Sequence, residues 1–162
     1  MKYDIPDANV KYIGNARDLY SQRGDIAYLY GAKGQRCTEA VFESLWTAEP
    51  TYFKKYSAQQ KTEIKNFCMG KRVMDCSGFI NECVHQFNYS SGYWRRARNK
   101  TSPEYGLDGN ILYTTFGGNG RHIGIDIGHG FFMHCPSEGK TLEIGVIADF
   151  PWEGSGRIEQ VR

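Results

Sequence analysis

The sequence has no long apolar run and no large excess of charge of one sign. No apolar stretch approaches the roughly 18 residues that a membrane span needs, so no membrane partner is predicted. Twenty Lys and Arg residues oppose eighteen Asp and Glu residues, and this formal charge of +2 predicts no nucleic-acid partner. The opening residues, MKYDIPDANV, lack the charged-then-apolar profile of a secretory signal, so the sequence predicts no particular location.

Paired cysteine motifs are also missing. The five cysteines are an odd number, and no two of them have C-x-x-C spacing: Cys37, Cys68, Cys76, Cys83 and Cys135. This pattern indicates neither a disulfide framework nor a paired-thiolate zinc site. At least one thiol is therefore left unpaired and available for other chemistry.

The length and the hydrophobic content of the sequence are typical of one compact domain. The 162 residues are 40% hydrophobic and 14% aromatic, and no repeat or linker divides them, so we expect a single monomeric domain over 1–162. Apolar periodicity and capping residues predict helices at about 8–22, from Thr38 to before Pro50, at 57–69 and at 75–87.

The character of the sequence changes in its second half. Residues 89–110 are rich in Ser, Gly, Arg and Asn, and we expect an irregular connection with a basic patch there. Strands are predicted at 111–116, 123–127, 131–135 and 142–147, with a glycine-rich turn at 117–120. Helices first and strands last predict an α+β fold, in which N-terminal helices pack on a C-terminal antiparallel sheet.

Cys76 is the strongest candidate for a nucleophile. Asp75 is a good N-cap for the helix at 75–87, which places Cys76 in its first turn. Unpaired backbone N–H groups and the helix dipole favour an anion at that position, so we expect a lowered thiol pKa. The Cys76 backbone N–H can also donate to the oxyanion that forms when the thiolate attacks a carbonyl, and Gly78 is expected to keep the approach open.

A candidate base follows from strand parity. If Gly128-His129-Gly130 is a three-residue hairpin loop, positions of equal parity on the two arms share a face. The isoleucines of 123–127 then lie on the buried face with Phe131, Met133 and Cys135, whereas His122, Asp126, Phe132 and His134 lie on the other. One of the two histidines can act as general base and the other can orient it, and Asp126 is the alternative partner.

These residues carry a family resemblance. Asp75-Cys76-Ser77-Gly78-Phe79, followed by His122-Ile123-Gly124-Ile125 and by His134 twelve positions after His122, resembles the NlpC-type papain-fold cysteine peptidases of bacterial cell walls. The segment Tyr28-Leu29-Tyr30-Gly31-Ala32-Lys33-Gly34 is similar to the tyrosine-containing segment that precedes the nucleophile in that family. The resemblance extends over about residues 8–150.

The resemblance implies a papain-like fold and a cysteine endopeptidase that needs no cofactor and no metal. Cys76 would be the nucleophile, His122 the general base and His134 the third, orienting residue. Tyr30 would offer its hydroxyl near the oxyanion or the substrate, and Asp75 and Ser77 would line a pocket for the free amine of a peptidoglycan stem peptide. The bond cleaved would be an amide of that peptide, such as the one between D-γ-glutamate and the diamino acid.

Three features differ from the family pattern. The stretch between Tyr30 and Cys76 is long and helical in character, Asp126 stands where the family more often has tyrosine, and Asp108-Gly109-Asn110 replaces the usual Pro-Gly-Asp. The last two lie toward the expected substrate face, so they bear on specificity more than on chemistry.

Alternative functions remain open at this point. Cys37 also opens a helix and is a competing nucleophile, and a thiol amidase or acyltransferase would use the same residue types. A zinc site is a further alternative because His122, Asp126, His129, His134 and Cys135 crowd one hairpin. A non-catalytic wall-binding module would instead use Tyr93, Trp94 and the arginines of 95–98 as its contact surface.

Overall fold

The N-terminal half of the chain consists mainly of helices, and N-capping residues mark the starts of two of them. The computed structural model describes residues 4–117 and 120–160. Helix α1 (Asp7–Ser21) is followed by a short 3-10 turn, Arg23–Asp25. The Thr38 hydroxyl accepts a hydrogen bond from Val41 N at the start of α2 (Glu39–Ala48), and Ser57 forms a capping box with Gln60 at the start of α4 (Ala58–Cys68). These helices confirm the predicted ones.

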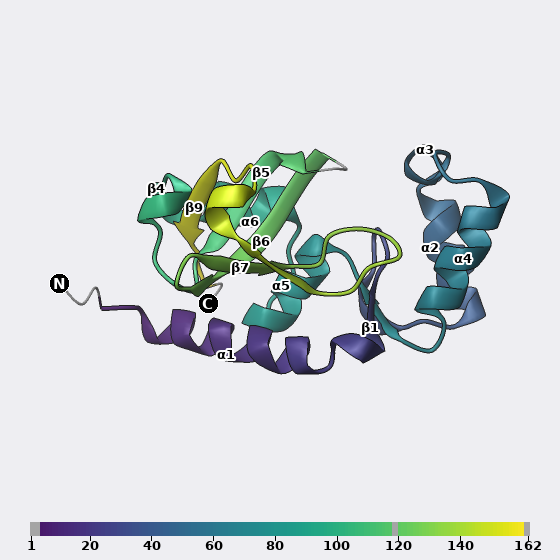
Figure 1. The fold of residues 1–162 in the computed structure, drawn as a ribbon, viewed down its shortest axis with the longest axis horizontal. Helices are drawn as coiled ribbons and strands as arrows, with labels where there is room; N and C mark the ends of the chain where they lie inside the picture. Colours follow the sequence, from purple (N-terminus) through teal and green to yellow (C-terminus); the bar gives the residue numbers. More distant parts are fainter. Residues whose placement is uncertain (1–3, 118–119, 161–162) are drawn as a thin grey trace.

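Helices α2, α3 (Pro50–Phe53) and α4 form a group at one end of the molecule (Figure 1). Phe42, Phe53 and Ile64 from the three helices are buried together with Leu29 and Val73. The long stretch between Tyr30 and Cys76 is thus a helical unit with its own apolar cluster, which it shares with the small sheet beside it.

The small sheet links this helical group to the centre of the molecule. Its strands are β1 (Ile26–Tyr28), β3 (Arg72–Met74) and β2 (Lys33–Arg36), in the order β1-β3-β2. Strand β3 runs parallel to β1 and antiparallel to β2, and Lys33 lies opposite Met74. This register brings the segment around Tyr30 against the chain just before Cys76.

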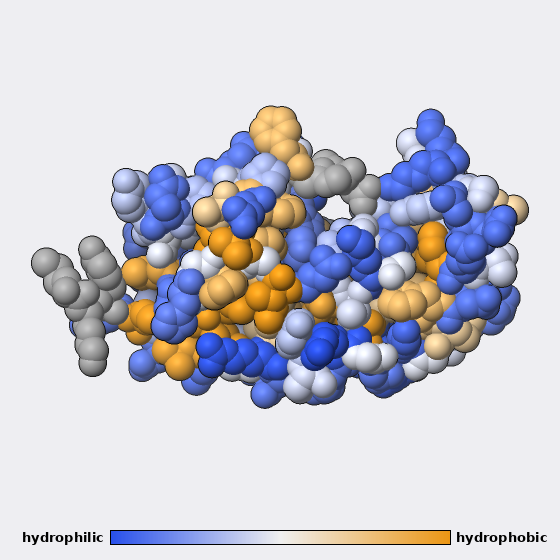
Figure 2. Space-filling view, viewed as in Figure 1, coloured by the Kyte–Doolittle hydropathy of each residue, from blue (hydrophilic) through white to orange (hydrophobic). Residues whose placement is uncertain are grey.

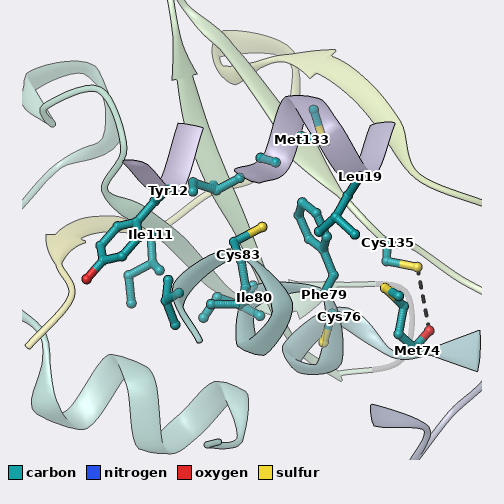
Figure 3. Packing of buried hydrophobic residues seen from close by; sticks show 14 of the residues in the cluster. Tyr12, Leu19, Met74, Cys76, Phe79, Ile80, Cys83, Ile111, Met133 and Cys135 are labelled. Carbon is teal, nitrogen blue, oxygen red and sulfur yellow. Dashed lines mark hydrogen bonds between the residues drawn. The ribbon is translucent and has the colours of Figure 1, made fainter. Parts of the chain in front are cut away.

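Helix α5 (Cys76–Val84) is the central helix of the main core. It packs against α1 on one side and the large sheet on the other (Figure 1). Phe79 and Ile80 are fully buried, and Figure 3 shows them among Leu19 of α1 and Met133 of the sheet. On the same side, the Cys135 thiol donates to the Met74 carbonyl at 3.6 Å. The helix that begins at Cys76 is therefore buried between α1 and the large sheet.

Within the described residues, the large sheet contains six strands in the order β4-β9-β5-β6-β7-β8, and all neighbours are antiparallel. The strands are β4 (Arg98–Thr101), β9 (Gly154–Arg157), β5 (Ile111–Gly117), β6 (Gly120–Gly128), β7 (Phe131–His134) and β8 (Glu143–Val146). A 3-10 turn, Ile147–Asp149, follows β8. The α+β prediction is confirmed. The glycine-rich turn predicted at 117–120 lies partly outside the described residues.

The prediction of an irregular connection at 89–110 is wrong. The segment forms α6 (Ser90–Arg96), β4 and a 3-10 turn, Pro103–Tyr105, because its aromatic residues anchor it. The Trp94 ring stacks on Tyr113 at 5.2 Å. Strand β9 was not predicted, because Gly154 takes the place of an apolar residue and a Cβ there would lie 2.4 Å from the Trp94 ring.

The surface is mostly hydrophilic over α1 and the α2–α4 group (Figure 2). Hydrophobic residues gather over β7 and β8, where Phe131, Ile144 and Val146 are 41–44% exposed. Phe131 was expected on the buried face, but it is exposed at the first residue of β7, where it follows the turn and pairs with Gly128 at the end of β6. Among the described residues, no helix combines the length and the apolar character needed to cross a membrane.

Candidate active site

A cleft of about 690 Å³ lies where the small sheet, the start of α5 and the large sheet meet. The tyrosine-containing segment contributes Tyr30 and Lys33, α5 contributes Cys76, and the hairpin contributes His122 and His134. Three separate parts of the sequence thus line one cavity, and they include all the residues that sequence reasoning singled out for catalysis.

The start of α5 positions Cys76 as predicted. Asp75 has extended backbone angles and its Oδ1 accepts from Gly78 N at 2.7 Å, as an N-cap does. Cys76 is 9% exposed, so its thiol is close to the cleft but largely shielded from solvent. Packing requires glycine at position 78, because a Cβ there would lie 2.6 Å from the Ala32 carbonyl oxygen.

The two histidines meet across the hairpin. Ile125 pairs with Met133 and Asp126 with Phe132, which is the register that the predicted three-residue loop implies. The loop itself is shorter than predicted, because Gly128 pairs with Phe131 and only His129 and Gly130 form the turn, and a bulge between Asp126 and Gly128 makes up the difference. His122 and His134 therefore lie diagonally on one face, and His122 Nε2 is 2.7 Å from His134 Nδ1. The opposite face is buried in the main core, as the alternation of apolar residues indicated.

The histidine contact determines which ring nitrogen is left for the thiol. His122 Nε2 is engaged with His134, so His122 Nδ1 is the nitrogen available to act as a base. His134 Nε2 lies 3.8 Å from Glu143 Oε2, directly across the β7–β8 pair. A carboxylate at this nitrogen favours the tautomer with the proton on His134 Nε2, which leaves Nδ1 free to accept from His122. Glu143 was not predicted as a site residue, and no motif in the sequence marks it.

Aromatic residues shield the histidines from water. The Trp152 ring stacks on His122 with centroids 5.6 Å apart, and Phe150 lies against both imidazoles. Burial lowers the pKa of His122 to about 4 and that of His134 to about 3. Both rings are therefore neutral near pH 7, which is the state a general base requires.

The expectation of a lowered thiol pKa at Cys76 is not met. Burial raises the pKa of Cys76 to about 12, and the neighbouring Asp75 carboxylate also raises it. The backbone amides of Ile123 and Ser77 and the ammonium of Lys33 favour the thiolate but do not overcome the burial. Near pH 7 the cleft therefore contains a neutral Cys76 thiol and a neutral His122 imidazole.

Asp75 and Ser77 already bind an ammonium group. Lys33 Nζ lies 2.7 Å from both carboxylate oxygens of Asp75 and 2.7 Å from Ser77 Oγ. Asp75 Oδ2 also accepts from Gly31 N at 3.2 Å. The expected pocket for a free substrate amine is therefore filled by a side chain of the protein itself. Lys33 belongs to the segment that carries the resemblance, but only the β2–β3 pairing reveals its contact with Asp75.

Tyr30 lies in the wall of the cleft and its ring stacks on Tyr52 of α3 at 3.9 Å. Tyr52 and Tyr56 both donate to Glu138 Oε2 at 2.9 Å, which joins the α2–α4 group to the loop after β7. Helix α3 thus packs against Tyr30, which lines the same cleft as Cys76.

The competing candidates lie elsewhere. Cys37 is 1% exposed, packs in the cluster of the α2–α4 group and does not line the cleft, and burial raises its pKa. In the zinc alternative, Cys135 points into the core on the opposite face from His134. Asp126 lines a separate depression with Asp108 and His129. Over residues 4–117 and 120–160, no three His, Cys, Asp or Glu side chains are grouped as metal ligands.

The surface considered for a non-catalytic module combines packed aromatic residues with exposed arginines. Tyr93 is 4% exposed and its hydroxyl donates to Asn81 Oδ1, while Trp94 packs on Tyr113. Arg95 and Arg96 are exposed at the end of α6. The aromatic part of this surface therefore has a structural role.

Comparison with protein-family models matches residues 53–155 to the NlpC/P60 family. The chain belongs to the NlpC/P60 family. The matched region contains Cys76, His122 and His134, so the family resemblance inferred from the motifs is confirmed. No curated protein matches the chain.

Solved NlpC/P60 structures share the papain-like fold of this chain. The NlpC/p60 domain of the peptidoglycan hydrolase SagA is 19% identical, with a TM-score of 0.55 over 93% of this chain and 98% of that one. NlpC1 from Trichomonas vaginalis is 12% identical, with a TM-score of 0.60 over 98% of this chain and 46% of that one. The peptidoglycan hydrolase RipB from Mycobacterium tuberculosis is 12% identical, with a TM-score of 0.57 over 96% and 70% of the two chains.

Proposed function

We propose that this NlpC/P60 protein is a cysteine endopeptidase that hydrolyses an amide bond in the peptide stem of peptidoglycan. Family membership and the peptidoglycan hydrolases among its structural neighbours support a cell-wall hydrolase. The observation that carries the cysteine mechanism is the 2.7 Å contact between His122 and His134 in the cleft that also contains Cys76. We propose these three residues as the catalytic set, within a single monomeric domain over 1–162.

The reaction begins when a substrate carbonyl displaces water from the cleft. The Cys76 thiol transfers its proton to His122 Nδ1 as the sulfur attacks the carbonyl carbon, and His134 stabilises the imidazolium through its contact with His122 Nε2. Negative charge then develops on the carbonyl oxygen. The Cys76 backbone N–H belongs to the first turn of α5, where N–H groups are not used by the helix itself, so it donates to this oxyanion, and the Tyr30 hydroxyl supports it.

Collapse of the tetrahedral intermediate breaks the C–N bond. His122 returns the proton to the leaving amine, which departs and leaves a thioester on Cys76. His122, neutral again, takes a proton from a water molecule that attacks the thioester, and the proton then returns to the sulfur. The products are a carboxylic acid and an amine, and the enzyme is restored.

The test is digestion of purified peptidoglycan followed by mass spectrometry of the released fragments. The expected product pair carries a new amine and a new acid within the stem peptide, for instance at the D-γ-glutamyl bond. Cys76→Ala should abolish the products without unfolding the protein, whereas Cys37→Ala should retain most of the activity and serves as the matched control. Full activity of folded Cys76→Ala would refute the proposed nucleophile.

A further inference from the structure

The niche formed by Asp75 and Ser77 lies immediately beside the nucleophile, one residue on either side of Cys76. A carboxylate and a hydroxyl at this place form a binding site for an ammonium group. In this structure the ammonium is that of Lys33, which approaches from β2 and is 17% exposed in its side chain. The site is therefore occupied from within the fold.

The Lys33 ammonium is saturated by its contacts. Its three N–H groups match three oxygens at 2.7 Å, two from Asp75 and one from Ser77. Ser77 Oγ in turn lies 3.1 Å from Asp75 Oδ1, to which it can donate. The Tyr89 ring lies 5.1 Å from Lys33 Nζ and adds a cation–π contact from the side of the cleft. Lys33 thus fills the niche and has no donor left to recruit an anion.

Backbone contacts hold the Lys33 segment against the segment that contains Asp75. Lys33 lies opposite Met74 in the β2–β3 pair, Asp75 N donates to the Ala32 carbonyl at 2.9 Å, and Gly31 N donates to Asp75. A substrate ammonium entering here would either break three charge-assisted hydrogen bonds or rest beside a like charge. Either event weakens its binding.

We propose that Lys33 is a specificity residue that excludes substrates with a free amino group at this subsite and directs the enzyme to peptides whose amino end is acylated. This inference rests on the proposed peptidase function and narrows its substrate class. A stem peptide still joined through its amino group to the glycan has such an amide, so the preferred substrate is intact wall material rather than a released peptide.

The experiment compares two synthetic stem peptides that differ only at the amino end, one free and one acetylated. Wild-type enzyme should hydrolyse the acetylated peptide with a kcat/KM at least equal to that of the free peptide. Lys33→Ala should shift the ratio toward the free peptide by about 10- to 100-fold, because the vacated niche can accept its ammonium. Lys33→Arg, which retains the charge, should keep the wild-type preference, and Lys11→Ala on the exposed face of α1 is the matched control.

A second readout does not depend on hydrolysis. Propylammonium replaces the atoms removed by Lys33→Ala, so millimolar concentrations should raise the Tm of that variant and leave the Tm of wild type unchanged. It should also inhibit the variant competitively against the free peptide only.

Two results separate the inference from the function on which it rests. A wild-type preference of tenfold or more for the free peptide, or an unchanged ratio in folded Lys33→Ala, would overturn the inference and leave the peptidase function standing. It would direct attention to another carboxylate of the cleft, Glu49, as the amine site. Failure of wild type to hydrolyse either peptide or peptidoglycan would overturn the function and this inference with it.

Discussion

Replacing Asp126 tests whether its carboxylate serves catalysis or only affects the stability of the fold. It lies on β6 opposite Phe132, is 4% exposed, and its Oδ1 accepts from Gly128 N at 2.9 Å. Burial raises the pKa of Asp126 from its ordinary value of 3.8 to about 6, and the nearby Asp108 carboxylate adds to the effect. Near neutral pH, the ionised Asp126 carboxylate therefore lowers the free energy of unfolding.

The sign of the pH dependence follows from linkage. The pKa of Asp126 is higher in the folded protein than in the unfolded chain, so the folded protein binds this proton more tightly. The contribution of Asp126 to the free energy of unfolding is therefore fully present below pH 3.8 and is lost as the pH rises through about 6. The difference between 3.8 and about 6 corresponds to about 3 kcal/mol at pH 8. Asp126→Asn keeps an oxygen acceptor for Gly128 N and removes the charge. It should stabilise the protein by up to about 3 kcal/mol at pH 8 and have little effect at pH 4.

The assay is urea-induced unfolding of wild type and Asp126→Asn at pH 4, 6 and 8, with Asp108→Asn as a control that should show the same trend more weakly. Activity on peptidoglycan should be retained, because Asp126 does not line the cleft with Cys76. Destabilisation at pH 8, or a difference in stability that does not change with pH, would refute the reasoning. A more than tenfold loss of activity in the folded variant would instead return Asp126 to the role of partner for His122.

His134→Ala should lower kcat about 10- to 1000-fold with little change in KM. His134→Gln should lower kcat less, because its amide oxygen can still accept a hydrogen bond from His122. Equal kcat values in both variants and wild type would contradict the orienting role of His134. The rate should be flat between about pH 5 and 9 and fall as pH drops toward 4, because the pKa of His122 is lowered to about 4 and that of Cys76 is raised to about 12. Two titration limbs within pH 5–9 would indicate a preformed thiolate–imidazolium pair instead. Gly78→Ala should destabilise the protein by about 1–3 kcal/mol in urea unfolding, because its Cβ would lie 2.6 Å from the Ala32 carbonyl oxygen. Wild-type stability of that variant would show that the helix can shift away from this contact.

Features that depend on neighbours in the chain could be predicted from the sequence. N-capping requires only a suitable residue before an amphipathic run, so Thr38 and Asp75 predicted the starts of their helices. Strand parity follows from the alternation of apolar residues, and this alternation placed His122 and His134 on the same face of the hairpin although the turn has two residues and a bulge instead of the three-residue loop. The family resemblance then connected this hairpin to Cys76.

Tertiary structure alone decided the features that depend on distant partners. Lys33 and Asp75 are 42 residues apart, and only the β2–β3 register brings the ammonium into the niche beside the nucleophile. The thiol pKa depends on the total burial of Cys76, which the first turn of its helix does not reveal, so the local expectation had the wrong sign. Two of the four residues of β9, Gly154 and Gly156, are glycines that make room for Trp94, so the strand shows no apolar alternation of its own. Packing and desolvation sum over the whole fold, whereas caps and parity are set within a few residues, and this difference separates what could be predicted from what could not.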